Sequence, residues 1–330
     1  MSASTNTLVE RTARPDGLYP LTLAVADYDR TRPLIDGRVK PDGIALTTNT
    51  SWIGDFCVRP VYEEYDTAEM SLSWYVMART RGEPVVALPV FPLRMPVFAY
   101  VFVREDSPYT KPSDLVGKRV ASILYRITIN LWLRGIFAEF YGLKPYELEW
   151  VVTVGEEGAG FRIPSGVRLT KDTSATPEQL LERGDVDAIF LPELPDGWVP
   201  GQSRIRRLFP DTQAEMRAFV QRTGMFPITH TVVMNKGLAD REPWIARSMT
   251  QAFCDAQDVC DAHLKADPKH TSLPDMVHFL EDQRAAYGPK SYEQGIEANR
   301  KVLETFVRYA YEQGYIPRVP TLEELFPSFG

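Results

Sequence analysis

The stretch "KPSDLVGKRVAS", residues 111–122, decides how this chain of 330 residues is organised. Pro112 begins a short helical turn, Gly117 ends it, and "KRVAS" then starts a new strand. An amphipathic helix follows over residues 125–141, because apolar side chains recur there at intervals of three and four. The stretch therefore opens a self-contained section in which strands and helices alternate.

Apolar runs before, within and after this section predict further strands. They lie at residues 18–29, 43–51, 84–91, 95–106, 186–191 and around His230. Helices are predicted between them. For example, one helix ends at Gly82, and another runs from the N-cap Thr176 to Gly184. The part of the chain after His230 is largely helical. This alternation predicts an α/β fold with mainly parallel strand pairing.

The order of these elements predicts two lobes. Lobe 1 is discontinuous and comprises residues 18–104 and 226–330, whereas lobe 2 comprises residues 105–225. Residues 1–17 are expected to form a flexible N-terminal segment. Each lobe should contain a mainly parallel sheet flanked by helices, with a ligand cleft between the lobes.

The composition limits the possible binding partners and the cellular compartment of the protein. A formal net charge of −7 argues against nucleic acid or an acidic membrane, since no net positive field attracts phosphate groups. No run approaches the roughly 18 apolar residues of a membrane-spanning helix, and residues 1–17 lack the apolar core of a secretory signal. Cys57, Cys254 and Cys260 form no paired framework, which favours a reducing, cytoplasmic compartment. The sequence does not determine the oligomeric state, and a homo-oligomer is compatible with it.

His230 lies in "RTGMFPITHTVVMNK", residues 222–236, within a predicted buried strand. One interpretation is a core histidine bonded to a backbone carbonyl. The other is a proton-transfer group beside the cleft, since imidazole titrates near neutral pH and this segment returns from lobe 2 to lobe 1. The remaining three histidines lie in polar surroundings near the C-terminus and suggest no metal-ligand set.

Several polar side chains in lobe 1 are candidates for the same cleft. Glu69 and Ser71 lie at a strand-to-helix junction, where α/β folds present ligand-binding groups, and Arg59 precedes them. Glu69 either caps or pairs structurally, or points its carboxylate into the cleft. Arg94 interrupts an apolar run, so it should have an anionic partner in the protein or the substrate.

The helix over residues 125–141 offers a second group of candidates. Arg126 and Thr128 lie at its start, where backbone N–H groups and the helix dipole favour an anion. Arg134 shares a helix face with Arg126, further from the helix start. The polar face is either solvated or binds a carboxylate in the cleft, with Tyr125, Arg126 and Thr128 as the main contacts.

Common signatures of other activities are absent from the sequence. It contains no GxGxxG motif after the first strand, no phosphate-binding glycine-rich loop, no GxSxG and no HExxH. The sequence therefore predicts no nucleotide cofactor and no metal site, and it leaves assistance by a divalent metal open.

Several motifs resemble the 4,5-dihydroxyphthalate decarboxylase family over nearly the whole chain from about residue 20. These are "PVFPLR", "DLVGKRVASILYRITINLWLRGIFAEFYG", "TGMFPITHTVVMNK", "GIEANRKVLETFVRYAYEQG" and "EELF". "KPSDLVGKRVAS" also resembles the beginning of the second lobe in type II periplasmic solute-binding proteins. The resemblance implies that fold and an enzyme that decarboxylates a hydroxylated aromatic carboxylate without an organic cofactor.

The resemblance also suggests roles for individual residues. It matches the family pattern at Glu69, Ser71, Tyr125, Thr128, Arg134 and His230, among others. His230 and Glu69 are expected to be catalytic, in an order of acid and base that the sequence leaves open. The expected substrate contacts are Arg59, Ser71, Arg94, Tyr125, Arg126, Thr128 and Arg134, and the expected partner is a small aromatic carboxylate.

Two departures from the family pattern leave the substrate open. After "PVFPLR" this chain has "MPVFAY" where the family tends to have an aromatic-Arg-His-Ser-like stretch, and "INL" replaces small residues after Thr128. Two other functions fit the same scaffold. One is a binding or sensing protein for a small aromatic carboxylate, and the other is a different lyase or dehydratase.

Overall fold

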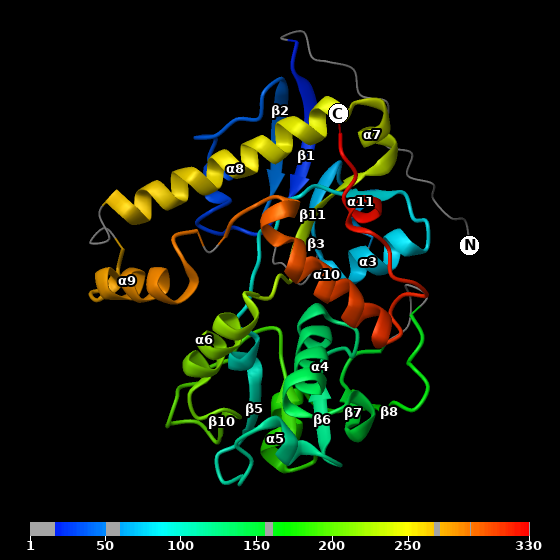
Figure 1. Ribbon diagram of the computed structural model, residues 1–330, viewed down its shortest axis with the longest axis vertical. Coiled ribbons are helices and arrows are strands. Elements are labelled where there is room, and N and C mark those ends of the chain that lie inside the picture. The colour runs from blue at the N-terminus through cyan, green and yellow to red at the C-terminus, as the bar shows by residue number, and fades with distance from the viewer. Residues whose placement is uncertain (1–16, 51–59, 156–160, 267–270, 291, 330) are drawn as a thin grey trace. The chain divides into compact units, whose positions relative to one another are not determined.

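The computed structural model describes residues 17–50, 60–155, 161–266, 271–290 and 292–329 (Figure 1). The predicted N-terminal segment lies outside these residues apart from its last residue. The chain forms two compact units. The first contains the described residues up to Arg94, His230–Leu303 and those from Pro320 onward, and the second contains Met95–Thr229 and Glu304–Val319.

The sheet of the first unit has five strands in the order β2-β1-β3-β11-β4. These strands are β1 (Tyr19–Ala24), β2 (Ile44–Asn49), β3 (Thr67–Ser71), β4 (Val85–Ala87) and β11 (His230–Asn235). β1 pairs in parallel with β2 and β3, whereas β11 runs antiparallel to both of its neighbours. Two of the four pairings are therefore antiparallel, and this sheet is mixed rather than mainly parallel because one strand is reversed.

Helices cover the sheet of the first unit (Figure 1). They are α1 (Arg32–Ile35), α3 (Leu72–Thr80), α7 (Lys236–Arg241), α8 (Pro243–Ala266) and α11 (Leu322–Leu325). α9 (Met276–Tyr287) lies away from the strands in Figure 1 and has no buried residue. α8 is amphipathic, and its apolar side chains, including Met249 and Phe253, join Leu23 of β1 and Val232 of β11 in one buried cluster. α3 packs against β3, β4 and β11 outside that cluster.

The sheet of the second unit has six strands in the order β10-β5-β9-β6-β7-β8. They are β5 (Val101–Arg104), β6 (Arg119–Ser122), β7 (Glu149–Val152), β8 (Arg168–Lys171), β9 (Ala188–Phe190) and β10 (Ile205–Arg207). β5 runs antiparallel to both of its neighbours, β9 and β10, whereas the pairings among β9, β6, β7 and β8 are parallel. The helices are α4 (Thr128–Tyr141), α5 (Pro177–Arg183) and α6 (Thr212–Thr223). α10 (Ile296–Glu312) contributes residues to both units.

The bounds of the two units differ from those predicted for the lobes. β5 belongs to the second unit because it pairs with β9 and β10. The C-terminal half of α10 also belongs there, since Phe306 and Tyr309 pack against Trp132 of α4. Part of the predicted strand over 95–106 is instead a 3-10 turn that follows Pro96, from which Phe98 reaches an aromatic core.

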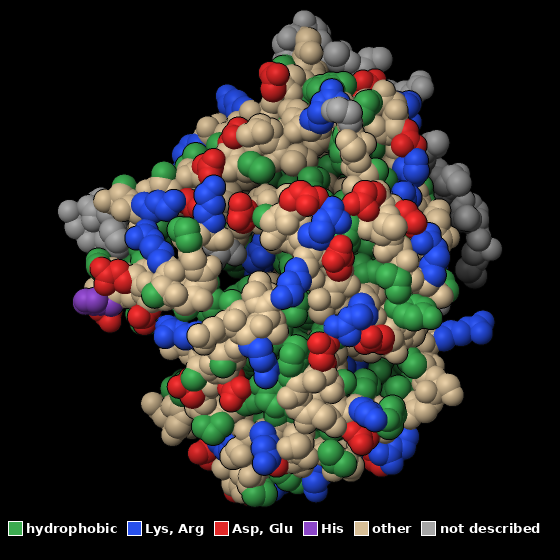
Figure 2. Space-filling view, in the orientation of Figure 1, with side chains coloured by type: hydrophobic (Ala, Val, Ile, Leu, Met, Phe, Trp, Pro, Cys, Tyr) green, Lys and Arg blue, Asp and Glu red, His purple; other side chains and the backbone are tan. Residues whose placement is uncertain are grey.

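Charge on the surface is mixed. Acidic and basic side chains are interspersed over the face shown in Figure 2. Within the described ranges, every helix is either too short or too polar to span a lipid bilayer.

Candidate active site

Glu69 and His230 are brought together by the antiparallel pairing of β3 with β11. In this register His230 lies opposite Ser71, and Val232 lies opposite Glu69. Glu69 and His230 are therefore diagonal neighbours on one face of the sheet, a spacing that long side chains can bridge. The imidazole Nδ1 of His230 lies 2.7 Å from Oε1 of Glu69.

The carboxylate of Glu69 is surrounded by hydrogen-bond donors. The residue is 0% exposed. The backbone N–H of Ala26 donates to Oε2 at 3.0 Å, and the hydroxyl of Tyr28 donates to Oε1 at 3.0 Å. A buried carboxylate is costly unless such donors satisfy it. These donors and His230 hold the carboxyl group in one orientation.

This environment determines which imidazole nitrogen is available for proton exchange. When Glu69 accepts a hydrogen bond from Nδ1–H, the lone pair of the neutral ring is on Nε2. A carboxylate that fixes the tautomer of a histidine is a common arrangement in acid–base sites. The imidazole of His230 thus bonds to a carboxylate, an arrangement compatible with a proton-transfer group.

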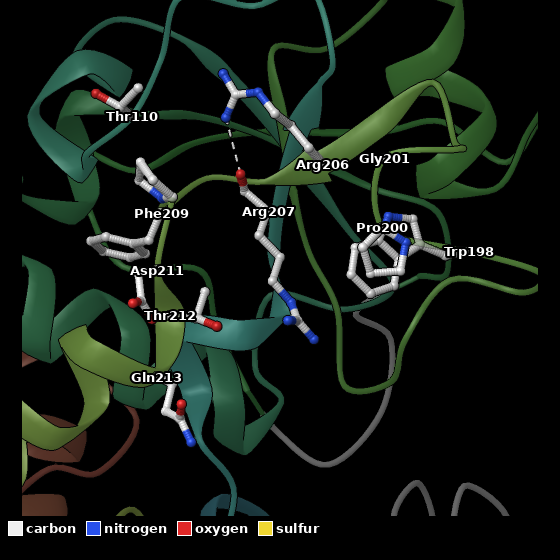
Figure 3. Close-up of a pocket in the computed structure, with 11 residues that line it drawn as sticks. Thr110, Trp198, Pro200, Gly201, Arg206, Arg207, Phe209, Asp211, Thr212 and Gln213 are labelled. Carbon is white, nitrogen blue, oxygen red and sulfur yellow. Dashed lines mark hydrogen bonds between the residues drawn. The ribbon is translucent and has the colours of Figure 1, made fainter.

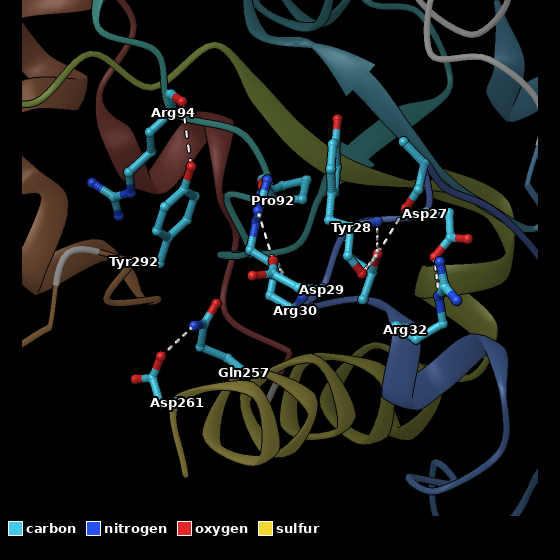
Figure 4. Close-up of polar contacts among 12 residues, drawn as sticks. Asp27, Tyr28, Asp29, Arg30, Arg32, Pro92, Arg94, Gln257, Asp261 and Tyr292 are labelled. Carbon is cyan, nitrogen blue, oxygen red and sulfur yellow. Dashed lines mark hydrogen bonds and ion pairs between the residues drawn. The ribbon is translucent and has the colours of Figure 1, made fainter. Parts of the chain in front are cut away.

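Arg94 is a buried cation in the same unit, drawn in Figure 4. It is 8% exposed, and its Nη2 donates to the carbonyl of Glu293 at 2.6 Å and to Oδ1 of Asn299 at 2.8 Å. Both acceptors are neutral. Burial lowers the pKa of Arg94 to about 10, so the guanidinium remains charged at neutral pH. Its Nε is buried and has no hydrogen-bond acceptor among the described residues.

The charges around Arg94 bear on the predicted choice between a protein anion and a substrate anion. Burial has the largest effect on the pKa of this guanidinium and lowers it, whereas the carboxylate of Glu293 acts on it electrostatically and raises the pKa. No described carboxylate forms an ion pair with this guanidinium. A buried cation with neutral partners is stabilised when an anion binds to it. Arg94 therefore has the chemistry of a carboxylate-binding residue.

Ser71 and Arg59 complete the candidates predicted in this part of the chain. Ser71 is buried at the end of β3, and its Oγ lies 3.4 Å from Oγ of Ser73. Its position opposite His230 places it next to the Glu69–His230 pair in the sheet. Arg59 lies outside the described residues.

In the second unit, Arg126 and Thr128 lie at the start of α4. Thr128 is the first residue of the helix, and both residues are buried. The first backbone N–H groups of a helix attract anions, so the start of α4 remains a candidate for binding a carboxylate. The alternative of a solvated polar face is wrong, because Asn130 and Arg134 of α4 are buried as well.

Arg134 bonds to protein groups on all sides. It is 1% exposed, and its guanidinium donates to Oε1 of Gln313 at 2.8 Å, to the carbonyl of Tyr125 at 3.0 Å and to the hydroxyl of Tyr315 at 2.5 Å. It also lies 3.7 Å from the ring centroid of Tyr125. The Tyr125 ring packs edge-on against Trp150. These contacts favour a structural role for Arg134 rather than the substrate contact expected from the sequence.

A pocket of about 460 Å³ in the second unit lies apart from the predicted residues (Figure 3). Arg206 and Arg207 of β10 line it and point in different directions. Arg206 donates to the carbonyls of Ser107 and Tyr109, and Nε of Arg207 donates to the carbonyl of Ala99. Both cations thus hold backbone segments together, and none of the predicted site residues lines this pocket.

No described group of three or more His, Cys, Asp or Glu side chains is arranged to hold a metal ion.

Sequence reasoning did not identify Tyr28, which contacts Glu69 directly. A signal was present, because the first strand is followed by the acidic and aromatic residues "DYD" (27–29). Polar residues after the carboxyl end of a strand are common ligand-binding positions in α/β folds.

Solved structures confirm the predicted fold. A periplasmic sulfonate-binding protein from Methylobacillus flagellatus KT matches with a TM-score of 0.55 at 12% identity, covering 95% of this chain and 93% of that one. The periplasmic aliphatic sulphonate binding protein of Escherichia coli matches with a TM-score of 0.52 at 16% identity, covering 93% and 91%. At this identity the likeness establishes the periplasmic-binding-protein-like fold alone.

Sequence relatives are more specific, although no family model matches the chain. A 4,5-dihydroxyphthalate decarboxylase from Comamonas testosteroni is 32% identical over 318 residues, which cover 93% of this chain and 96% of that protein. Another, from Pseudomonas putida, is 31% identical over 202 residues, or 58% and 78% of the two chains. Both relatives are decarboxylases, which confirms the predicted class of carboxy-lyase. The chain belongs to the 4,5-dihydroxyphthalate decarboxylase family.

Proposed function

We propose that this protein decarboxylates a hydroxylated aromatic carboxylate related to 4,5-dihydroxyphthalate, releasing CO2 and the corresponding phenolic acid without an organic cofactor. The family relationship supports the reaction class. The observation that carries the proposal is the buried Glu69–His230 pair, with Nδ1 of the imidazole 2.7 Å from the carboxylate.

The reaction needs proton transfer at two places. Direct loss of CO2 from an arene would leave an aryl anion that no orbital of the ring can delocalise. A hydroxyl ortho or para to the departing carboxylate provides another route. When a base removes the phenol proton, the electron pair moves into the ring, and the carbon that bears the carboxylate takes up a proton. The bond to the carboxylate carbon then breaks, and its electron pair restores the aromatic ring as CO2 leaves. The ring oxygen is left as a phenolate, which takes up a proton from solvent.

His230 is proposed to carry out the proton transfer through Nε2. Glu69 would hold the tautomer that makes Nε2 basic and would stabilise the imidazolium that forms when the phenol proton is taken. The imidazolium could then return a proton toward the ring. This assignment makes His230 the residue that contacts the reacting atoms and Glu69 its partner.

The carboxylate that the substrate retains requires a cationic anchor. Arg94 is proposed for this role in the first unit, because it is charged and buried and the acceptors of its hydrogen bonds are neutral. A guanidinium can bind a carboxylate through two parallel hydrogen bonds. Ser71 beside the catalytic pair, and Arg126 with Thr128 at the start of α4, are proposed as further substrate contacts. Tyr125 is proposed to support them through the loop before α4.

A second candidate function follows from the fold. The matching solved structures are solute-binding proteins, so a binding or sensing protein for a small aromatic carboxylate remains the main alternative. A different lyase or dehydratase on the same scaffold is the third possibility.

One experiment separates these functions. The purified protein is incubated with 4,5-dihydroxyphthalate, phthalate and a set of hydroxybenzoates, each labelled with ¹³C at the carboxyl group, and ¹³CO2 is measured by mass spectrometry. The proposal requires labelled CO2 from at least one hydroxylated acid and none from phthalate, which lacks the hydroxyl. Ligand-dependent thermal stabilisation without any product would identify a binding protein instead. Loss of water without CO2 would identify a dehydratase.

A further inference from the structure

Arg30 lies between two tyrosine rings in the first unit, as Figure 4 shows. Its guanidinium carbon is 4.1 Å from the ring centroid of Tyr28 and 4.3 Å from that of Tyr292. The Arg30 side chain is 13% exposed, which is unusually low for an arginine without a buried carboxylate partner. A planar guanidinium stacks well on aromatic faces, and the attraction strengthens when water is excluded.

Hydrogen bonds fix the position of this guanidinium. Nε of Arg30 donates to the carbonyl of Pro92 at 2.5 Å, and Nη1 donates to Oδ1 of Asp29 at 3.2 Å. The hydroxyl of Tyr292 in turn donates to the carbonyl of Arg94 at 3.4 Å. Arg30 thereby joins the loop after β1 to the segment around Pro92 and to the segment before α10.

Tyr28 connects this stack to the candidate catalytic pair. Its hydroxyl donates to Oε1 of Glu69, the same oxygen that lies 2.7 Å from Nδ1 of His230. Its backbone N–H donates to Oγ1 of Thr31 at 2.9 Å. The loop after β1 therefore supplies Ala26 N–H to one oxygen of Glu69 and Tyr28 OH to the other.

We infer that Arg30 is a positioning residue for the Glu69–His230 pair and acts through Tyr28. By holding the Tyr28 ring, Arg30 keeps the phenol directed at Oε1 of Glu69. The carboxylate then has one rotamer and one orientation toward Nδ1 of His230. Only the kinetic consequence rests on the proposed function, because the effect on the imidazole can be measured in the absence of any substrate.

A double-mutant cycle tests whether Arg30 acts through Tyr28. Tyr28→Phe removes the hydroxyl and keeps the ring, whereas Arg30→Met removes the charge and keeps much of the length. Each single variant should lower kcat about tenfold, since each weakens a hydrogen bond to a charged group. The double variant should also lose about tenfold rather than about a hundredfold, because both changes remove the same interaction. KM should change little.

A spectroscopic measurement tests the same inference without turnover. In ¹⁵N-labelled protein, the Nδ1 proton of His230 can be assigned by its absence from His230→Gln. We expect this signal to be sharp in the unaltered protein and to broaden in both Tyr28→Phe and Arg30→Met. Arg32→Met is the matched control, because Arg32 begins α1 directly after this loop and pairs at the surface with Asp27.

The outcomes distinguish the two proposals. A signal that is unchanged in Tyr28→Phe and Arg30→Met would overturn the positioning role, as would additive losses of kcat in the double variant. If no acid is decarboxylated but the imidazole signal responds as expected, the proposed function fails and the positioning role stands. A response of the signal to Arg32→Met equal to that of Arg30→Met would also contradict a specific role for Arg30.

Discussion

His230 and Glu69 are 161 residues apart in the chain, yet their side chains meet at 2.7 Å because β3 and β11 pair antiparallel. The strand that carries His230 is the reversed strand of its sheet. The pair is buried, and backbone and phenol donors satisfy its carboxylate. This relationship is the basis of the mechanism proposed for the protein.

Replacing His230 should abolish most of the activity. We expect His230→Ala to lower kcat by at least about 10²-fold, because a general acid–base group contributes about that much or more. The measurement is the rate of ¹³CO2 release, with circular dichroism to verify that the variant is folded. His278→Ala is the control, since His278 lies on α9 and pairs with Asp275 at the surface. Near-normal turnover of folded His230→Ala would remove this residue from the mechanism.

Glu69→Gln should affect both stability and turnover. The amide cannot accept from all three donors, so we expect a loss of about 1–3 kcal/mol in the free energy of unfolding. The loss of the correct imidazole tautomer should lower kcat by about 10²-fold or more. Asp66→Asn is a matched control, because Asp66 is another buried carboxylate and accepts two hydrogen bonds from Thr22. If both variants lose stability and kcat equally, Glu69 has only a structural role.

Arg94→Met should remove the stabilisation that a bound carboxylate provides. We expect the increase in Tm produced by 4,5-dihydroxyphthalate to fall severalfold, because the variant lacks the cation proposed to anchor the retained carboxylate. The Tm of the ligand-free variant should change little, since removing a buried charge offsets the loss of its hydrogen bonds. Scanning fluorimetry measures both values. Arg38→Met, at an exposed arginine paired with Asp36, should retain the full shift, and retention of that shift by Arg94→Met would contradict the anchor role.

Arg134→Lys distinguishes a structural role from a substrate contact. Lysine cannot reach Gln313, Tyr315 and the Tyr125 carbonyl together, so we expect the free energy of unfolding to fall by about 2 kcal/mol or more. Urea denaturation provides this value, and KM is measured on the same samples. A rise in KM with unchanged stability would instead support the substrate contact that the sequence predicts.

Gly135→Ala should destabilise the second unit. A Cβ at this position would lie 2.2 Å from a ring atom of Tyr309, which is buried and cannot move away easily. Alanine normally favours a helix by about 1 kcal/mol over glycine, but this clash should reverse the sign and cost about 1–3 kcal/mol. Urea denaturation measures the change. Gly237→Ala is the comparison in helix α7, where the nearest atom would be a side-chain oxygen at 3.2 Å, and it should be tolerated better.

Several features of the fold could be predicted because their signals are local. Buried strands need runs of apolar residues, and helices need apolar residues at intervals of three and four. The predicted N-cap is also confirmed, since Oγ1 of Thr176 accepts from the backbone N–H of Gln179. These patterns sufficed to predict the α/β class and the largely helical C-terminal part. Candidate residues at strand ends and helix starts could be identified for the same reason.

The partners of the polar residues depended on the tertiary structure. Arg94 bonds to Asn299, 205 residues away, and Arg134 bonds to Gln313, 179 residues away. The two departures from the family pattern also fall largely on residues that the fold buries, including Phe98 and Leu131. Local sequence determines which segments form strands and helices, because that depends on neighbouring residues. Which charges meet was decided by strand order and direction, since these bring distant segments into contact.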